Sequence, residues 1–211
     1  MKIHNYPGFF VAIAGLDGCG LSTQVRLVTK ALLQEKVKVF STKEPTNGPV
    51  GKLIKDVLNG KYCSLPPAAL QLLFAADRGC HLASDIIPRL KKGELVITDR
   101  YAWSSVAYGS VDLSTEWLFN LNKNYILPDL TIFIEVNPEV CLKRLAKEKR
   151  SLELFEEKEK LEMAWATYHS LVTKYWWTYM VVVDGEQKRQ QVTEAILARI
   201  KSHSKFKKIK K

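Results

Sequence analysis

Short apolar runs alternate along the chain with longer segments whose apolar residues recur every three or four positions. The short runs predict five buried β-strands, at residues 9–14, 37–40, 95–98, 130–136 and 180–183. The longer segments predict helices at residues 22–35, 50–58, 66–90 and 192–200, one that begins at Pro138, and one that contains residues 165–171. Strands alternating with helices favour an α/β fold in which a parallel five-stranded sheet carries helices on both faces.

We expect the chain to form a single domain over residues 1–211. Residues 42–49 (TKEPTNGP) are a predicted loop because of their proline, asparagine and glycine content. Pro88 is positioned to kink the helix predicted over residues 66–90. The chain contains neither an internal repeat nor a linker-like segment, and its 211 residues, 46% of them hydrophobic, suffice for one sizeable core.

The charge of the chain favours contact with polyanions. Its net charge is +10, and part of the excess is local, since residues 201–211 carry six lysines and no acidic residue. We expect this basic tail to be a solvated, frayed chain end rather than a nucleic-acid-binding arm.

Neither a membrane protein nor a secreted one is expected. No apolar run approaches the ~20 residues of a membrane span, and residues 1–8 lack the apolar core of a secretory signal. The cysteines at positions 19, 63, 80 and 141 form neither a metal-binding spacing nor a dense disulfide framework. The sequence therefore predicts reduced thiols and a cytoplasmic location.

The most informative motif lies between the first predicted strand and its helix. Residues 15–22 (GLDGCGLS) have the spacing of a phosphate-binding loop, G-x-x-x-x-G-K-[ST], except that Leu21 stands where the motif has lysine. Glycines let backbone N–H groups surround phosphate oxygens, and the following helix points its positive end at them. Ser22 would supply a hydroxyl to Mg²⁺. The expected nucleotide-binding residues are Gly15, Leu16, Asp17, Gly18, Cys19, Gly20, Leu21, Ser22 and Thr23.

Polar groups also follow two other predicted strands. Lys43 and Glu44 come after the second strand, and Asp99 and Arg100 come after the third. In an open parallel sheet the carboxyl ends of the strands form the ligand crevice, so these groups are expected to meet the glycine-rich loop there.

With these groups, six segments give the chain a resemblance to the thymidylate kinases, which transfer the γ-phosphoryl group of ATP to dTMP. The segments follow the family's order and separations over nearly the whole chain: residues 9–24 (FFVAIAGLDGCGLSTQ), 43–51 (KEPTNGPVG), 72–78 (LLFAADR), 97–108 (ITDRYAWSSVAY), 128–136 (PDLTIFIEV) and 181–186 (VVVDGE). Residues 44–49 look more like the archaeal branch than the bacterial one. The resemblance implies a P-loop nucleoside-monophosphate kinase fold, ATP and Mg²⁺ as cofactors, dTMP as acceptor, and a homodimer.

The resemblance also implies a substrate-binding set: Asp17, Lys43, Phe74, Arg78, Arg100, Ser105 and Tyr108. Asp17 would accept a hydrogen bond from the 3′-hydroxyl, Phe74 would stack on the thymine, and Arg78 would reach a thymine carbonyl. Ser105 would bond the thymine edge, and Tyr108 would lie under the sugar. Structural alternatives stay open, because an aspartate can form a turn, aromatic and serine side chains can pack between helices, and an arginine can pair with surface acids.

Asp99 and Arg100 are the expected catalytic residues. A carboxylate at the end of a buried strand is costly unless it meets a cation, so Asp99 would hold Mg²⁺ with Ser22, through water. The planar fork of Arg100 would bridge donor and acceptor phosphates. The alternative is that Asp99 and Arg100 cap the next helix. Lys43 stands where the family often has arginine, so a point charge replaces a fork.

Leu21 is the main departure from the family pattern. Losing one preorganised donor to the transferred phosphoryl group typically costs roughly 10²–10³ in rate, so reduced activity is expected. By resemblance the lid covers about residues 144–157, where Arg144 would bind the nucleotide. Arg150, or else Lys147, would replace the missing cation; the alternative is that this charged run is a solvated helix face.

Three functions remain open from the sequence. The first is a dTMP kinase with reduced activity, the second a nucleotide-binding homologue that has lost catalysis and acts through interactions, and the third a kinase for another pyrimidine monophosphate such as dUMP. The apolar face around Leu70, Leu73 and Leu82 suits the implied dimer and equally suits a monomer core.

Overall fold

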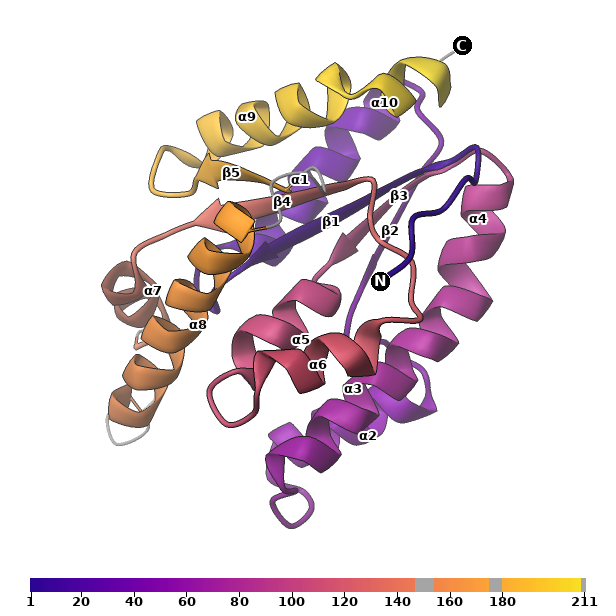
Figure 1. The fold of residues 1–211 in the computed structure, drawn as a ribbon. Coiled ribbons are helices and arrows are strands. Elements are labelled where there is room, and N and C mark those ends of the chain that lie inside the picture. Colours follow the sequence, from indigo (N-terminus) through magenta and orange to yellow (C-terminus); the bar gives the residue numbers. More distant parts are fainter. Residues whose placement is uncertain (147–153, 175–179, 210–211) are drawn as a thin grey trace.

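The fold is built on one parallel sheet (Figure 1). The computed structural model describes residues 1–146, 154–174 and 180–209, with side chains in the second range from residue 158 onward. Within these ranges the sheet has the five predicted strands in the order β2-β3-β1-β4-β5. Their bounds are β1 (Phe9–Gly15), β2 (Val39–Lys43), β3 (Leu95–Asp99), β4 (Leu130–Glu135) and β5 (Met180–Asp184).

Helices connect the strands and cover both faces of the sheet, as predicted. Figure 1 shows α9 on one side of the sheet and α3 to α6 on the other. The helical elements are α1 (Leu21–Gln34), α2 (Pro49–Leu58), α3 (Pro67–His81), η1 (Leu82–Ile86), α4 (Ile87–Lys91), α5 (Ala102–Gly109), α6 (Thr115–Asn122), α7 (Pro138–Leu145), α8 (Leu154–Lys174), α9 (Arg189–Ser202) and α10 (Ser204–Ile209). In the ranges that the structure describes, no helix is both long and apolar enough to cross a bilayer.

The register of the parallel strands brings the candidate residues together. Asp99, the last residue of β3, lies opposite Ile13 of β1 and Lys43 of β2. Gly15, the last residue of β1, lies opposite Ile134 of β4. The segments that follow β1, β2 and β3 therefore emerge at one edge of the sheet, which is the edge expected to bind the ligand.

Side chains of the central strand alternate between two apolar clusters. Phe9 and Val11 pack with residues of α1 and α9, whereas Phe10 and Ala12 pack with residues of η1 and α4. Leu82 belongs to the second cluster and is buried. Of the two roles that the sequence left open for Leu82, the structure therefore supports the monomer core.

Pro88 follows an irregular turn in the helix predicted over residues 66–90. The helical segment is continuous from α3 through η1 to α4, and η1 is a π-helical turn that ends just before Pro88. Proline has no N–H to donate to the preceding turn, and its ring crowds the carbonyl four residues earlier. A wider turn accommodates both defects without ending the helix.

Two helices between β3 and β4 had no counterpart in the sequence prediction. α5 is buried on nearly every side, so its sequence (AWSSVAYG) has no polar face to reveal a helical period. α6 is short, although Ser114 caps it by accepting a hydrogen bond from the backbone N–H of Trp117.

The expected frayed tail is instead structured over the residues that the structure describes. α9 extends to Ser202, and α10 buries Phe206 against the main core. The ammonium of Lys205 lies 2.7 Å from Asp129 and donates to the carbonyl of Tyr6. This helix was not evident from the sequence, because lysines surround the two apolar residues, Phe206 and Ile209, that pack on the core.

Replacing Phe206 with alanine should therefore lower the free energy of unfolding by about 3 kcal/mol, because it empties a core position. Denaturant unfolding monitored by circular dichroism measures the change. The matched control is Lys207→Ala on the exposed side of α10, which should change stability by less than about 0.5 kcal/mol. Equal stability of the two variants would mean that the tail is not docked.

Candidate active site

Residues 15–22, called the glycine loop from here on, have the backbone geometry of an anion-binding loop. Gly18 and Gly20 have φ of +80° and +91°, which glycine adopts without strain. A Cβ on Gly18 would lie 2.7 Å from the carbonyl oxygen of Cys141, so that position also has no room for a side chain. The loop leads directly into α1, whose positive end faces the same space.

Leu21 is part of the apolar core rather than of a charged site. Its side chain is only 6% exposed and packs in the cluster that contains Val25 and Val28 of the same helix. Leu16 and Cys19 of the loop are buried in this cluster too. The glycine loop thus offers backbone N–H groups to a phosphate but no side-chain cation of its own.

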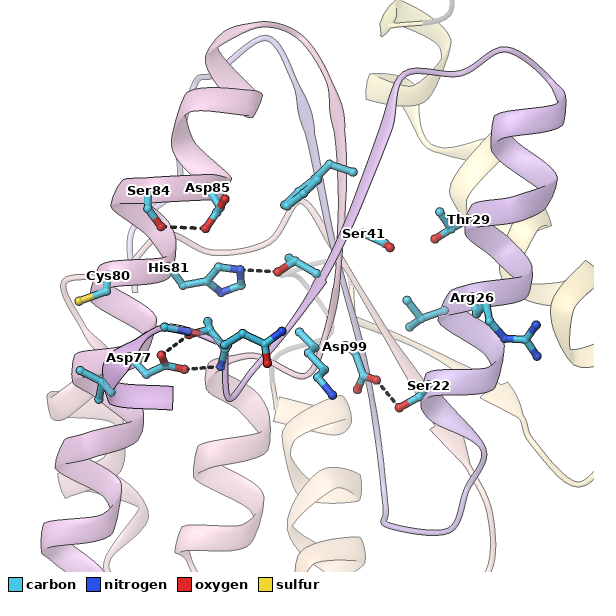
Figure 2. Close-up of a pocket in the computed structure, with 18 of the residues that line it drawn as sticks. Ser22, Arg26, Thr29, Ser41, Asp77, Cys80, His81, Ser84, Asp85 and Asp99 are labelled. Carbon is cyan, nitrogen blue, oxygen red and sulfur yellow. Dashed lines mark hydrogen bonds between the residues drawn. The ribbon is translucent and has the colours of Figure 1, made fainter. Parts of the chain in front are cut away.

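Ser22 and Asp99 adjoin, as the proposed Mg²⁺ site requires. The Ser22 hydroxyl donates to Asp99 Oδ2 at 2.6 Å, across the gap between α1 and the end of β3 (Figure 2). Among the described residues, no group of three or more His, Cys, Asp or Glu side chains could enclose a metal. Mg²⁺ commonly keeps several waters and uses one or two protein ligands plus phosphate oxygens, so this oxygen pair fits it.

The same pair opens into a cavity of about 1000 Å³, the α1–α3 cavity. Figure 2 shows Arg26 and Thr29 of α1 on one wall and Asp77 and His81 of α3 on the other. Lys43 lines this cavity and is exposed there. It therefore lies beside Asp99, its partner in the sheet, and not with the other expected substrate residues.

Those other residues share a second cavity of about 640 Å³, between α3, α5 and the glycine loop. We call it the α3–α5 cavity. The expected substrate residues on its lining are Asp17, Phe74, Arg78, Arg100, Ser105 and Tyr108. Residues more than 90 positions apart in the sequence thus converge on one space of nucleoside size.

Arg100 is held in a strained conformation over this cavity. Its φ is +69°, a region that costs a non-glycine residue about 1–2 kcal/mol and that clusters at functional sites. The guanidinium donates to the carbonyl of Gly15 at 3.0 Å and to Asp17 Oδ1 at 2.6 Å, and it lies over the Tyr108 ring. These contacts aim the fork of Arg100 at the mouth of the glycine loop.

Tyr108 lines the α3–α5 cavity on the side that faces Arg100. Its hydroxyl accepts the backbone N–H of Asp17 at 2.8 Å. Burial raises the pKa of Tyr108 well above its ordinary value, with Arg100 opposing the shift. The phenol therefore stays neutral and serves as a rigid wall.

Burial also determines the protonation state of Cys19 in the glycine loop. It raises the pKa of Cys19 to about 11, although nearby Arg100 opposes the shift. Since the thiolate is the nucleophilic form, Cys19 is an inert packing residue at neutral pH.

Arg78 is fully buried, which the sequence alone did not indicate. Its Nε and one terminal nitrogen donate to Glu44 Oε2 at 2.9 and 2.7 Å, and the other terminal nitrogen donates to Asn122. It also donates to Ser105 Oγ at 3.0 Å. The alternative of a surface network with neighbouring acids is therefore wrong. Asp77, one of those acids, instead accepts from Thr46.

The other carboxylate oxygen of Glu44 contacts a second residue of α3. His81 Nδ1 lies 3.2 Å from Glu44 Oε1, and His81 Nε2 lies 2.7 Å from the Thr42 hydroxyl. The loop after β2 is thus fixed to α3 by a buried network. His81 and Asn122 belong to this network but not to the expected site. Neither lies in a recognisable sequence motif, so their part in the network is evident only in the folded structure.

Part of the expected lid falls among the described residues. Arg144, near the end of α7, lies 3.3 Å from the carbonyl oxygens of Gly18 and Cys19. It lines a third cavity, of about 300 Å³, together with Thr23 and Arg189. Arg150 and Lys147 lie outside the described residues.

The buried pair yields a stability prediction. Glu44→Gln should lower the free energy of unfolding by about 3 kcal/mol, because it leaves the buried charge of Arg78 without its counter-charge. The matched control is Glu159→Gln on the exposed surface of α8, with a change below about 0.5 kcal/mol. Urea unfolding measures both, and a neutral effect of Glu44→Gln would refute the buried ion pair.

Known proteins are similar to this chain over most of its length. Residues 13–196 match the thymidylate kinase family. A probable thymidylate kinase from Pyrobaculum aerophilum is 35% identical over 200 residues, which is 94% of this chain and 99% of the relative. The thymidylate kinase of Leptospira interrogans serovar copenhageni is 32% identical over 207 residues, with coverage of 95% and 99%. A probable thymidylate kinase from Methanococcus maripaludis is 35% identical over 195 residues, with coverage of 89% and 92%. Together with the parallel sheet and glycine loop, these matches establish that the chain belongs to the thymidylate kinase family.

Proposed function

We propose that this protein transfers the γ-phosphoryl group of ATP to dTMP, with Mg²⁺, and does so more slowly than a relative that has the loop lysine. The observation that carries the proposal is the convergence of six expected substrate residues on the α3–α5 cavity. That cavity has the volume of a small-molecule site and opens beside the glycine loop, so a bound monophosphate would present its phosphate to the donor nucleotide.

The residues of the cavity have distinct roles in this reaction. Phe74 supplies a half-buried aromatic face for the base, while Arg78 and Ser105 supply polar groups at its edge. Tyr108 walls the sugar. When dTMP binds, Asp17 would exchange its contact with Arg100 for the 3′-hydroxyl, which frees one edge of the guanidinium for phosphate oxygens.

Phosphoryl transfer depends on positioning and on charge rather than on proton transfer. Arg100 would span the donor and acceptor phosphates, and Lys43 would approach them from the α1–α3 cavity. Mg²⁺ held near Ser22 and Asp99 would neutralise charge on the transferred and bridging oxygens. Arg144 would hold the nucleotide beside the glycine loop.

A nucleotide-binding homologue without catalysis is the second candidate, and Leu21 favours it. An apolar, buried residue at the lysine position removes a cation that follows the transferred phosphoryl group. Retention of the six expected substrate residues in the α3–α5 cavity favours the kinase, because all six are expected to contact the acceptor. Kinase activity on dUMP is a third candidate, since both bases share the same hydrogen-bonding edge.

We also propose a homodimer, as the family resemblance implies. Leu53 of α2 and Leu72 of α3 are 40% and 52% exposed, so these adjoining helices retain apolar surface that a second copy could cover. Sedimentation velocity of the purified protein would measure its mass in solution.

Restoring the lysine tests the chemistry directly. Leu21→Lys should raise kcat by up to about 10²-fold, because it returns one preorganised donor to the phosphoryl group. Leu21→Met is the matched control, since it has similar length without charge and should leave kcat nearly unchanged. A coupled assay with ATP, Mg²⁺ and dTMP measures all three proteins.

Arg100→Ala gives the background rate of turnover in the same assay. It should lower turnover by about 10³-fold or more, because it removes the cation that spans both phosphates. Wild-type turnover no higher than this background, with dTMP still raising the melting temperature, would contradict the kinase proposal and favour the binding homologue. An equal kcat for Leu21→Lys and wild type would show that another cation already fills the role.

A further inference from the structure

Gln71 is a polar residue of the α3–α5 cavity to which the proposed function gives no role. It lies on α3 one turn before Phe74 and two turns before Arg78, so the three side chains share one face of the helix. All three line the cavity. Gln71 is only 7% exposed, which is unusual for an uncharged amide unless a partner satisfies it.

The opposite wall explains how a glutamine fits there. A Cβ placed on Gly109 of α5 would lie 3.1 Å from the carboxamide carbon of Gln71 and 2.8 Å from Leu118 Cδ2. The bare backbone of Gly109 therefore makes room for the amide. Ser105 lies one turn earlier on the same helix, so the amide of Gln71 sits one turn along the wall from the Ser105 hydroxyl.

The amide is not satisfied by the protein. Gln71 Oε1 is buried and has no hydrogen-bond partner in the part of the chain that the structure describes. Arg78, by contrast, donates to both Glu44 and Ser105. A buried carbonyl without a partner destabilises the free protein, so its presence in a cavity points to a ligand that completes it.

We propose that the carboxamide of Gln71 binds the imide edge of a pyrimidine-2,4-dione, and that it helps to select such bases. The inference rests on the proposed function. A carboxamide places one acceptor and one donor side by side, which matches the N3–H donor and an adjacent ring carbonyl. Arg78 has only hydrogen-bond donors. It therefore suits the second ring carbonyl of the base and disfavours cytosine, which carries an amino group in place of that carbonyl.

Gln71→Met tests the assignment, because methionine keeps the length of the side chain and removes its hydrogen bonds. The dissociation constant for dTMP, measured by calorimetry, should rise about tenfold, the effect of one lost hydrogen bond to a buried ligand group. The melting temperature of the ligand-free variant should stay unchanged or rise, because no internal hydrogen bond is lost. The control is Gln34→Met, an exposed glutamine at the end of α1, which should bind dTMP as wild type does.

A modified ligand separates recognition of the base edge from a packing effect. The 3-methyl derivative of dTMP cannot donate from N3, so wild type and Gln71→Met should bind it equally weakly. Equal affinity of the two proteins for dTMP would overturn the role of Gln71 while leaving the proposed function intact. An equal loss of affinity for both ligands in Gln71→Met would also overturn it, as a packing effect. Failure of the wild type to bind dTMP at all would overturn the proposed function and this inference with it.

Discussion

The buried ion pair between Arg78 and Glu44 is the constraint on which the candidate site depends. A guanidinium with almost no exposure persists only if most of its donors are filled, and here a carboxylate, an amide and a hydroxyl accept four hydrogen bonds from it. These partners come from the loop after β2 and from α5 and α6. One satisfied charge therefore fixes the distance between α3 and α5, which is the width of the cavity between them, and it orders the loop that follows Lys43.

At the glycine loop the protein offers fixed dipoles rather than a mobile side-chain charge. The glycine loop contributes backbone N–H groups and the start of α1, while the usual lysine position has become part of the core. Arg100 is held by a carbonyl, a carboxylate and an aromatic ring, so its charge is preorganised rather than flexible. Such a site can hold polyanions well and still lack a charge that moves with the transferred group.

Local patterns in the sequence could predict the sheet, the glycine loop and the groups at the strand ends. The strands are short apolar runs, and Gly15 to Ser22 form a motif within eight residues, so both signals are contiguous. The contacts of Arg78 could not be predicted, because Glu44 and Asn122 lie 34 and 44 positions away and only the fold selects them among many polar residues. α5 was hidden by burial on nearly all sides, and α10 by the lysines around Phe206. Gln71 gave no signal, since its neighbour Gly109 becomes informative only when the two helices are packed.

The docked end of the chain has a consequence for how the protein is made. β1 is the central strand, and its first residue, Phe9, stacks on His203, while Lys205 reaches Asp129 and the backbone near β1. A ribosome makes residues 201–209 long after β1, so the apolar start of the first strand stays uncovered until they have been made. Nascent chains of this protein therefore depend on late closure of the core, and loss of residues 201–209 would leave the start of β1 exposed and prone to aggregation.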